Sequence, residues 1–443
     1  MSRDAQVDPA LHRSRRQKLL NELGPGVLVL STALETQRNG DVQHEYRPSS
    51  DFHYLTGFPE PESVLVAWRI DRKSHHAILF VRERDPLRET WDGPRSGVRG
   101  AKVLYGADEG RAIGDLWHDL AELIPLDGRL FHALGQDPTM DQRLLAACAQ
   151  GRAKHRRTLL PAHPVIQDPS PALAGLRLVK DRSELLAIRK AAKLTELGHI
   201  AAMQATRPGM YEYESQAVME SAFRAGGSAR NGYPSIVASG VNACVLHYHE
   251  NDRRMRSGDL LLIDAGAEFQ GLTADVTRTF PVNGRFTDAQ AAVYRIVLRA
   301  QLAGIRACKV GAPWDSAHRA CIRSLTGGLC ELGVLRGKVP KLIKDAAFKP
   351  WYMHGTSHWL GRDVHDVGGY QNLDAKPEPL PVGSVLTVEP GLYFNKRDSR
   401  VPAALRGIGI RIEDDVLVTK KGPEVLTDGV PKSIAAIERL MAQ

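Results

Sequence analysis

Four acidic residues in or beside strand-like apolar runs are the strongest candidates for chemistry in this sequence. They are Asp264, Asp275, Glu389 and Glu413. A carboxylate in such a run is costly to bury unless it pairs with a cation or binds a metal. Any one of them alone is most simply explained by an ion pair, with Arg278 for the two aspartates and Arg411 for Glu413. Four acids in a repeated frame favour a metal site instead.

The repeated frame contains two of these acids. The segments RSGDLLLIDAG (256–266) and PVGSVLTVEPG (381–391) align without a gap, each with a glycine and a polar residue before an apolar strand and an acid after it. Unless this resemblance is chance, each segment places one carboxylate, Asp264 or Glu389, at the end of a buried strand. After Asp264, the letters EFQG predict a hairpin turn that brings Asp275 to the same face.

A histidine-rich segment, MHGTSHWLGRDVHDVGG (353–369), adds imidazoles to these acids. His354 and His358 have the i, i+4 spacing of a helical metal site. The nearby glycines favour a loop, however, so only one of the two need be a ligand. Ser357 lacks the far glycine of a nucleophile elbow, which argues against a serine hydrolase.

A second histidine pair lies further back, in CVLHYHENDR. We predict a strand over CVLHYH, with His247 and His249 on the same face because side chains alternate along a strand. The letters HENDR place Arg253 where a helical zinc-protease motif requires its second histidine, so that motif is absent.

The elements that position these residues fall into two domains. The runs GVLVLST, SVLVAWRI and HAILFVRE, with the helix-like AIGDLWHDLAELI, predict an N-terminal α/β domain. The proline-rich PAHPVIQDPSPAL then precedes a long helix that begins at a capping box of Asp181 and Glu184, and the letters TDAQ open a later helix in the same way. We therefore assign residues 1–174 to the first domain and 175–443 to the second.

Composition excludes several classes of protein. The 59 basic residues are spread along the chain and balanced by 51 acids, so the net charge of +8 indicates a mildly basic surface and no nucleic-acid site. Five cysteines without a CxxC pair indicate neither a disulfide framework nor a zinc ribbon, and favour a reducing compartment. No apolar leader or membrane span is predicted. We expect a cytoplasmic protein that binds no membrane.

Several motifs together resemble a known family. LHYHEN, LLIDAGAEFQGLTADVTRTFPVNGRF, MHGTSHWLGRDVHDVG, VLTVEPGLY and GIGIRIEDDVLVT occur in the order found in the pita-bread metallopeptidases. They are most similar to aminopeptidase P, the Xaa-Pro aminopeptidase family, whose N-terminal domain the segment RPSSDFHYLTGFPEPESVLV also resembles. The resemblance implies an α+β fold, with a C-terminal pita-bread catalytic domain preceded by the α/β domain.

The resemblance also implies roles for individual residues. Five residues match the ligands of a dinuclear metal centre, with Asp275 and Glu413 as the bridges: Asp264, Asp275, His358, Glu389 and Glu413. Other positions match substrate-facing histidines or a trio beside the metal centre: His247, His354 and His365, then Tyr233, Arg411 and Asp41. Glu389 would also move a proton. Trp91 resembles a loop residue that approaches a neighbouring subunit's site, although it would equally serve to anchor its own loop.

The implied reaction is hydrolysis of Xaa-Pro-Yaa peptides, releasing the first residue through a hydroxide that bridges two metal ions. A ligand set rich in carboxylates suits Mn²⁺, with Co²⁺ or Zn²⁺ possible in the same frame. The resemblance implies a homo-oligomer, a dimer or tetramer. Three alternatives stay open: a prolidase acting on Xaa-Pro dipeptides, a non-catalytic pita-bread binding protein, and a metal-free amidinohydrolase. A measurement of bound metal would distinguish a metallopeptidase from the binding protein and from the amidinohydrolase.

Overall fold

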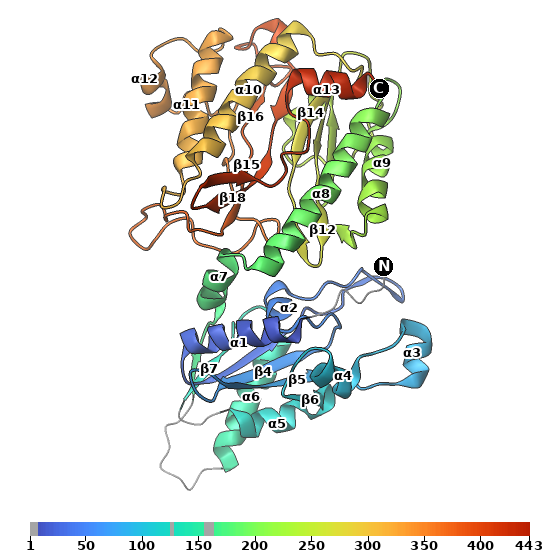
Figure 1. Ribbon diagram of the computed structural model, residues 1–443, viewed down its shortest axis with the longest axis vertical. Helices are drawn as coiled ribbons and strands as arrows, with labels where there is room; N and C mark the ends of the chain where they lie inside the picture. The colour runs from blue at the N-terminus through green and yellow to red at the C-terminus, as the bar shows by residue number, and fades with distance from the viewer. Residues whose placement is uncertain (1–7, 125–127, 155–163) are drawn as a thin grey trace. The chain divides into compact units, whose positions relative to one another are not determined.

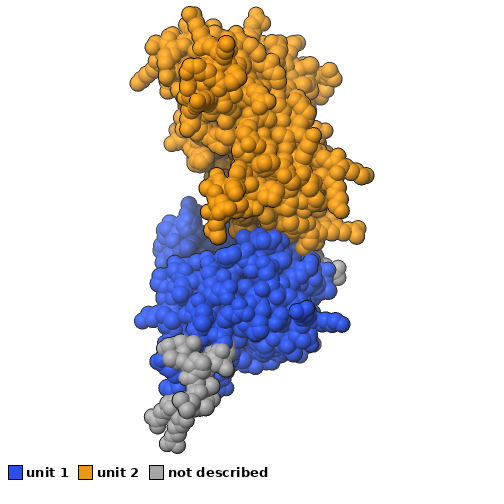
Figure 2. Space-filling model, turned by 90° about the vertical axis from the view of Figure 1, so that its left-hand side faces the viewer, with its two compact units in different colours: residues 1–176 blue, residues 177–443 orange. Residues whose placement is uncertain are grey.

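The computed structural model describes residues 8–124, 128–154 and 164–443, so the start of the proline-rich stretch predicted before the domain boundary lies outside it. The chain forms two compact units, residues 1–176 and 177–443 (Figure 2). Helix α7 (Ser170–Leu178) crosses this division. The sequence places the boundary between residues 174 and 175. Each unit is described separately below.

Unit 1 is built on a mixed sheet. Among its described residues, six strands run in the order β6-β5-β4-β1-β7-β8. Their bounds are Val27–Ser31 (β1), Val64–Arg69 (β4), His75–Val81 (β5), Glu109–Ala112 (β6), Arg129–Phe131 (β7) and Val165–Gln167 (β8). The strands β1, β4 and β5 pair antiparallel, and the other pairs are parallel. A hairpin of β2 (Gln37–Asn39) and β3 (Val42–Gln43) stands outside this sheet.

Helices cover both faces of this sheet (Figure 1). They are α1 (Pro9–Leu23), α2 (Ser50–Thr56) and α4 (Gly97–Val103) on one face, and α5 (Leu116–Leu123) and α6 (Pro138–Lys154) on the other. Two separate cores result, because Leu28 of β1 packs among residues of the first group while Val27 and Val29 pack among the second. Burial on both faces explains why these strands read as continuous apolar runs. Helix α3 (Pro86–Asp92) has no buried residue.

Unit 2, all of which is described, contains two strand groups of similar construction. The first is the sheet β10-β11-β14 and the second is β15-β18-β19. Their strands are Ile236–Ser239 (β10), Leu260–Asp264 (β11), Thr277–Pro281 (β14), Val385–Val388 (β15), Asp414–Thr419 (β18) and Gly422–Val425 (β19). Smaller sheets join β9 (Arg230–Asn231), β12 (Ala267–Phe269) and β13 (Leu272–Thr273), and β16 (Gly391–Tyr393) with β17 (Gly409–Arg411).

Helices pack around these sheets (Figure 1). They are α8 (Arg182–Ala205), α9 (Glu212–Ala225), α10 (Asp288–Ala307), α11 (Ser316–Glu331), α12 (Val339–Lys344) and α13 (Ile434–Met441). Both predicted capping boxes are confirmed, that of Asp181 with Glu184 before α8 and that of Thr287 with Gln290 before α10. The predicted α+β class is confirmed as well. No helix in the described ranges combines the length and the apolar character that a membrane crossing requires.

The predicted hairpin after Asp264 is also confirmed. Strand β12 pairs with β13 through Glu268 opposite Thr273 and Phe269 opposite Leu272. Gln270 and Gly271 form the two-residue turn, with φ of 53° and 75°. Positive φ at both positions is what a tight hairpin turn requires, and glycine adopts it without a steric cost.

Candidate metal centre

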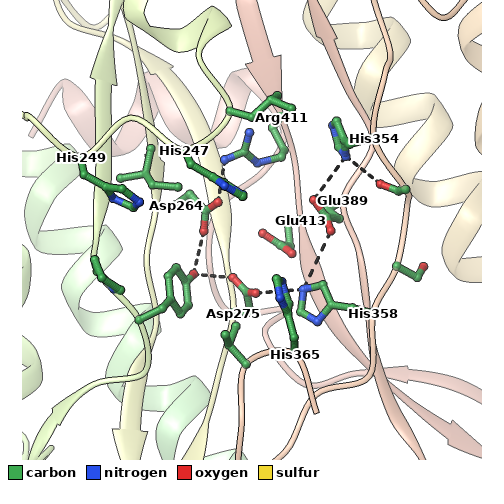
Figure 3. Close-up of a pocket in the computed structure, with 17 residues that line it drawn as sticks. His247, His249, Asp264, Asp275, His354, His358, His365, Glu389, Arg411 and Glu413 are labelled. Carbon is green, nitrogen blue, oxygen red and sulfur yellow. Dashed lines mark hydrogen bonds and ion pairs between the residues drawn. The ribbon is translucent and has the colours of Figure 1, made fainter. Parts of the chain in front are cut away.

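A cavity of about 390 Å³ in unit 2 collects nearly all of the predicted site residues (Figure 3). The residues brought together are Tyr233, His247, Asp264, Asp275, His354, His358, His365, Glu389, Arg411 and Glu413. Asp41 is not among them, because it lies in unit 1, exposed in the turn between β2 and β3. Trp91 lies on α3, also in unit 1, with 85% of its surface exposed.

The two strand groups deliver the four acids in the same way. Asp264 ends β11 and lies opposite Thr277, the first residue of β14, so Asp275 lies two residues before that partner strand. Glu389 follows β15, whose Val388 lies opposite Asp414, so that Glu413 comes directly before β18. Each half of the repeat thus places one acid after a strand and one before its antiparallel neighbour.

Arg411 and Tyr233 hold the first pair of acids. Arg411 donates from Nη2 to Asp264 Oδ2 at 2.6 Å, and the Tyr233 hydroxyl donates to Asp264 Oδ1 at 2.7 Å. The same hydroxyl contacts Asp275 Oδ1, so it joins the two aspartates.

Ion pairs were an alternative to metal binding in the sequence analysis, and the structure shows that the predicted partners are wrong. Arg411 pairs with Asp264 and not with Glu413. Arg278 pairs with Asp414 at 2.8 Å and donates to the backbone carbonyl of Glu413, so it supports the strand end and neutralises neither Asp264 nor Asp275. The reason is that the Arg278 side chain is fully buried among backbone carbonyls and Asp414.

His358 presents one ring nitrogen to the acids. Its Nδ1 lies 3.0 Å from the carbonyl oxygen of Trp359, which can only accept, so Nδ1 carries the proton. Nε2 then faces Asp275 Oδ2 at 3.3 Å and Glu389 Oε1 at 3.9 Å. Ligand atoms of Asp275, His358 and Glu413 all lie within 4.8 Å of one another. A backbone carbonyl that fixes the imidazole in this way is a common support for a metal ligand.

Tyr393 is a residue of the site that sequence reasoning missed. The Nδ1 of His354 donates to Gly355 O at 2.7 Å, so its Nε2 accepts from the Tyr393 hydroxyl at 2.8 Å. That hydroxyl in turn accepts from Arg411 Nη1 at 3.1 Å. The available signal was the glycine in EPGLY, because a Cβ on Gly391 would lie 2.4 Å from the Tyr393 hydroxyl oxygen.

Asp415 was also missed. It is fully buried, and its Oδ2 accepts a hydrogen bond from the backbone N–H of Asp275 at 3.1 Å. Thr277, likewise fully buried, donates from its hydroxyl to Glu413 Oε2 at 2.7 Å. These contacts orient two of the proposed ligands. The signal for Asp415 was the run of three acids in IEDD, which is unusual within a buried strand.

The predicted strand CVLHYH is wrong. Residues Gly240–Cys244 form a 3-10 helix and a turn follows it, and the described strands nearby form no ladder of hydrogen bonds with this segment. His247 and His249 nevertheless face the same cavity, with ring centroids 6.4 Å apart. Between them Tyr248 points inward, where its hydroxyl contacts buried Glu212 at 2.8 Å.

The acids crowd a region with little positive charge. Burial raises the pKa of Asp264, raises that of Glu389 to about 7, and raises that of Glu413 well above its usual range, with nearby carboxylates adding to the effect. Burial lowers the pKa of His358, but Asp275 outweighs it and raises the pKa to about 9. Arg411 is the one arginine or lysine among the described residues that line the cavity. Four acids against one permanent cation suit divalent metal ions.

Comparisons with known proteins identify relatives along the whole chain. Residues 187–420 match the model of metallopeptidase family M24, and residues 12–131 match that of the aminopeptidase P N-terminal domain. The Xaa-Pro aminopeptidase of Escherichia coli (strain K12) is 42% identical over 429 residues, which is 96% of both chains. Human Xaa-Pro aminopeptidase 3 is 33% identical over 451 residues, 99% of this chain and 86% of that one.

Solved structures agree with these matches. The Pseudomonas aeruginosa aminopeptidase PepP superimposes with a TM-score of 0.95 at 44% identity, covering 99% of this chain and 98% of that one. A zinc-substituted E. coli aminopeptidase P in complex with product gives 0.94 at 41% identity, with 99% of both chains covered.

The pKa values predict that metal binding releases protons. Near pH 7 the metal-free site holds a proton on His358 and in part on Glu389, the raised pKa of Glu413 favours a proton there as well, and a ligand must lose its proton to bind. The apparent affinity should therefore rise as the pH increases from 6 to 8. Calorimetric titration with Mn²⁺ in buffers of different ionisation enthalpy measures the protons released. Glu413→Gln should release fewer. Binding of Mn²⁺ without release of protons between pH 6 and 8 would contradict the assignment.

Proposed function

Because this chain belongs to the metallopeptidase family M24 and within it to aminopeptidase P, we propose that its five clustered ligands hold two divalent ions. The protein is a metal-dependent aminopeptidase that releases the N-terminal residue from peptides with proline in the second position. The observation that carries the metal proposal is the convergence of four buried carboxylates and the Nε2 of His358 in one cavity.

The residues that would hold the ions are Asp264, Asp275, His358, Glu389 and Glu413, with Asp275 and Glu413 as the carboxylates that the two ions would share. When bound, the ions supply a water nucleophile near neutral pH and polarise the scissile carbonyl. Mn²⁺ is the ion that we propose, because the set is rich in hard oxygen donors, and Co²⁺ or Zn²⁺ fit the same donors less selectively.

Glu389 is suited to move a proton between the two sides of the site. Its Oε1 faces His358, a ligand, while its Oε2 lies 3.6 Å from Nδ1 of His354 on the substrate side. An amide nitrogen must gain a proton before it can leave, and a carboxylate that contacts both the ligand set and the substrate side can deliver it. Glu389 therefore passes the proton to the proline nitrogen.

Histidines on opposite walls complete the proposed machinery. His247 and His365 both line the cavity, and one of them would donate an N–H group to the developing oxyanion beside the metal. His354 is held neutral, because burial lowers its pKa to about 3, and Tyr393 fixes its orientation. A neutral imidazole at His354 offers an apolar face to a proline ring, and the His247 ring would add a second wall to the same pocket. Arg411 and Tyr233 orient the ligands through their hydrogen bonds to Asp264, whereas a role for Asp41 rests on the family resemblance alone.

One observation favours an aminopeptidase over a prolidase. A site for Xaa-Pro dipeptides benefits from a cation that pairs with the free carboxylate on the proline. Arg411 is the sole such group among the described residues that line the cavity, and Asp264, Thr277 and Tyr393 already occupy its guanidinium.

We predict a substrate order that follows from this difference. The protein should cleave Ala-Pro-Ala readily, Ala-Pro slowly or not at all, and Ala-Ala-Ala poorly because the ring pocket is unfilled. Values of kcat/KM for the three peptides, measured on one metal-loaded sample, test every clause. Preference for the dipeptide would make the protein a prolidase, and equal rates on the two tripeptides would remove the proline specificity.

We predict that metal binding and catalysis can be separated by substitution. Asp275→Asn should lose at least one of two ions per chain together with activity, because a bridging carboxylate contacts both ions. His365→Ala should keep both ions and lose on the order of 10²–10³ in kcat if it stabilises the oxyanion. Metal analysis beside kinetics on the same samples provides the test. Full metal occupancy and turnover in Asp275→Asn would refute the ligand assignment, and metal loss in His365→Ala would show that it acts as a ligand.

Helix α3 supports the proposal that the protein is a homo-oligomer. Leu87 and Trp91 occupy one face of this helix, four residues apart, with 82% and 85% of their surfaces exposed. A pair of large apolar side chains so exposed is typical of a surface that a partner covers. We assign that partner as a second copy of the chain, whose active site Trp91 approaches.

Five cysteines, all free, support a cytoplasmic location.

We predict that Trp91→Asp weakens the assembly. Sedimentation analysis should find the native chain as a dimer or tetramer and the variant shifted to smaller species, with lower activity if Trp91 completes a neighbouring site. Leu373→Asp is the matched control, because Leu373 is fully exposed in unit 2 and should leave assembly unchanged. A native chain that is monomeric at micromolar concentration would rule the proposal out.

A further inference from the structure

A buried ionic cluster lies directly behind the loop that carries His365. The Asp366 carboxylate receives Arg177 Nη2 on Oδ1 at 2.5 Å and Lys180 Nζ on Oδ2 at 2.8 Å. Arg177, Lys180 and Asp366 expose only 3%, 5% and 6% of their surfaces. Arg177 Nη2 also pairs with the partly exposed Asp363 at 2.8 Å, so the buried part of the cluster comprises Arg177, Lys180 and Asp366, none of which lines the cavity.

Backbone contacts tie the same cluster to neighbouring segments. The N–H of Asp366 donates to Trp359 O at 2.9 Å, and the N–H of Lys180 donates to Gly383 O at 3.0 Å. A Cβ on Gly361 would lie 2.1 Å from Asp366 Oδ2, so the carboxylate occupies space that only a glycine leaves open. Removing one partner of such a buried pair leaves an uncompensated charge, which is strongly unfavourable.

His365 itself has no comparable support. Its side chain is exposed, and within the described residues we see no hydrogen bond to its ring, which contacts the His358 ring at a centroid distance of 4.4 Å. The orientation of His365 toward the cavity must therefore come from its backbone. The adjacent residue that fixes this backbone is Asp366.

We propose that Arg177, Lys180 and Asp366 act as a clamp that positions His365 for catalysis. They are positioning residues, because they touch neither the cavity nor the proposed ligands. The inference rests on the proposed role of His365 in the reaction. Its physical basis is that a displacement of about 1 Å in a catalytic group can cost on the order of 10² in rate. The clamp also makes residues 177–180, at the start of unit 2, part of the machinery.

The test is a double-substitution cycle in the full-length, Mn²⁺-loaded enzyme. Asp366→Asn preserves shape and removes the charge, and it should lower kcat about 10-fold to 100-fold with both metal ions retained and KM little changed. His365→Ala in combination with Asp366→Asn should be no slower than His365→Ala alone, because the clamp acts through that histidine. If Asp366→Asn instead disturbed the whole unit, the fold-loss in kcat of the double variant would equal the product of the losses in the two single variants.

Controls keep the outcomes distinct. Glu268→Gln alters another buried carboxylate of unit 2, paired with Arg230 at 3.1 Å, and should leave kcat unchanged. If Asp366→Asn does not fold, Lys180→Met retains the Arg177–Asp366 pair and provides the same cycle. Unchanged kcat, loss of metal, or multiplied losses in the double variant would each overturn the clamp. Full activity of His365→Ala would instead overturn the proposed role of that histidine.

Discussion

The structure depends on keeping four carboxylates together where they repel one another. Two like charges about 4 Å apart cost roughly 4 kcal/mol at the effective dielectric constant of a protein surface, and more when water is excluded. Asp264, Asp275, Glu389 and Glu413 are all held in one cavity with Arg411 as the permanent countercharge. In the metal-free state the proton on His358 and the raised pKa of Glu413 relieve part of this cost, and bound divalent ions would relieve more of it.

The scaffold resists that repulsion with strands and buried hydrogen bonds. Asp264 and Glu413 lie at the ends of the central strands β11 and β18, each paired on both sides, and Asp275 and Glu389 lie beside the strands β14 and β15 that pair with them, which limits how far the four backbones can move apart. Behind them, Arg278 and Asp414 form a fully buried pair to which Lys432 and Gln301 also contribute. This network fixes the carbonyl of Glu413 from the side remote from the cavity. The repeated construction explains why the two halves supply equivalent acids.

Much of the site could be predicted from sequence because its acids stand in regular, repeated surroundings. The strand ends at Asp264 and Glu389, the hairpin turn and both capping boxes follow from local rules, and local rules are visible in a sequence. The pairing of Arg411 with Asp264 was not visible, since it joins residues 147 positions apart. Tyr393 and Asp415 were missed for the same reason, because their hydrogen bonds join residues that are far apart in the sequence. The turn at His247 was mistaken for a strand because its side chains alternate between the cavity and the interior, as they do along a strand.

That turn separates the residues that hold the backbone from those that face the cavity. Tyr248 and Asn251 anchor it from inside, through Glu212 and through the backbone of Ser235 and Val237, while the histidines on either side of Tyr248 carry none of these bonds. Exchange of His249 would therefore alter the cavity wall without disturbing the turn. A single substitution at this position can therefore change the surface that faces the substrate while the turn keeps its hydrogen bonds.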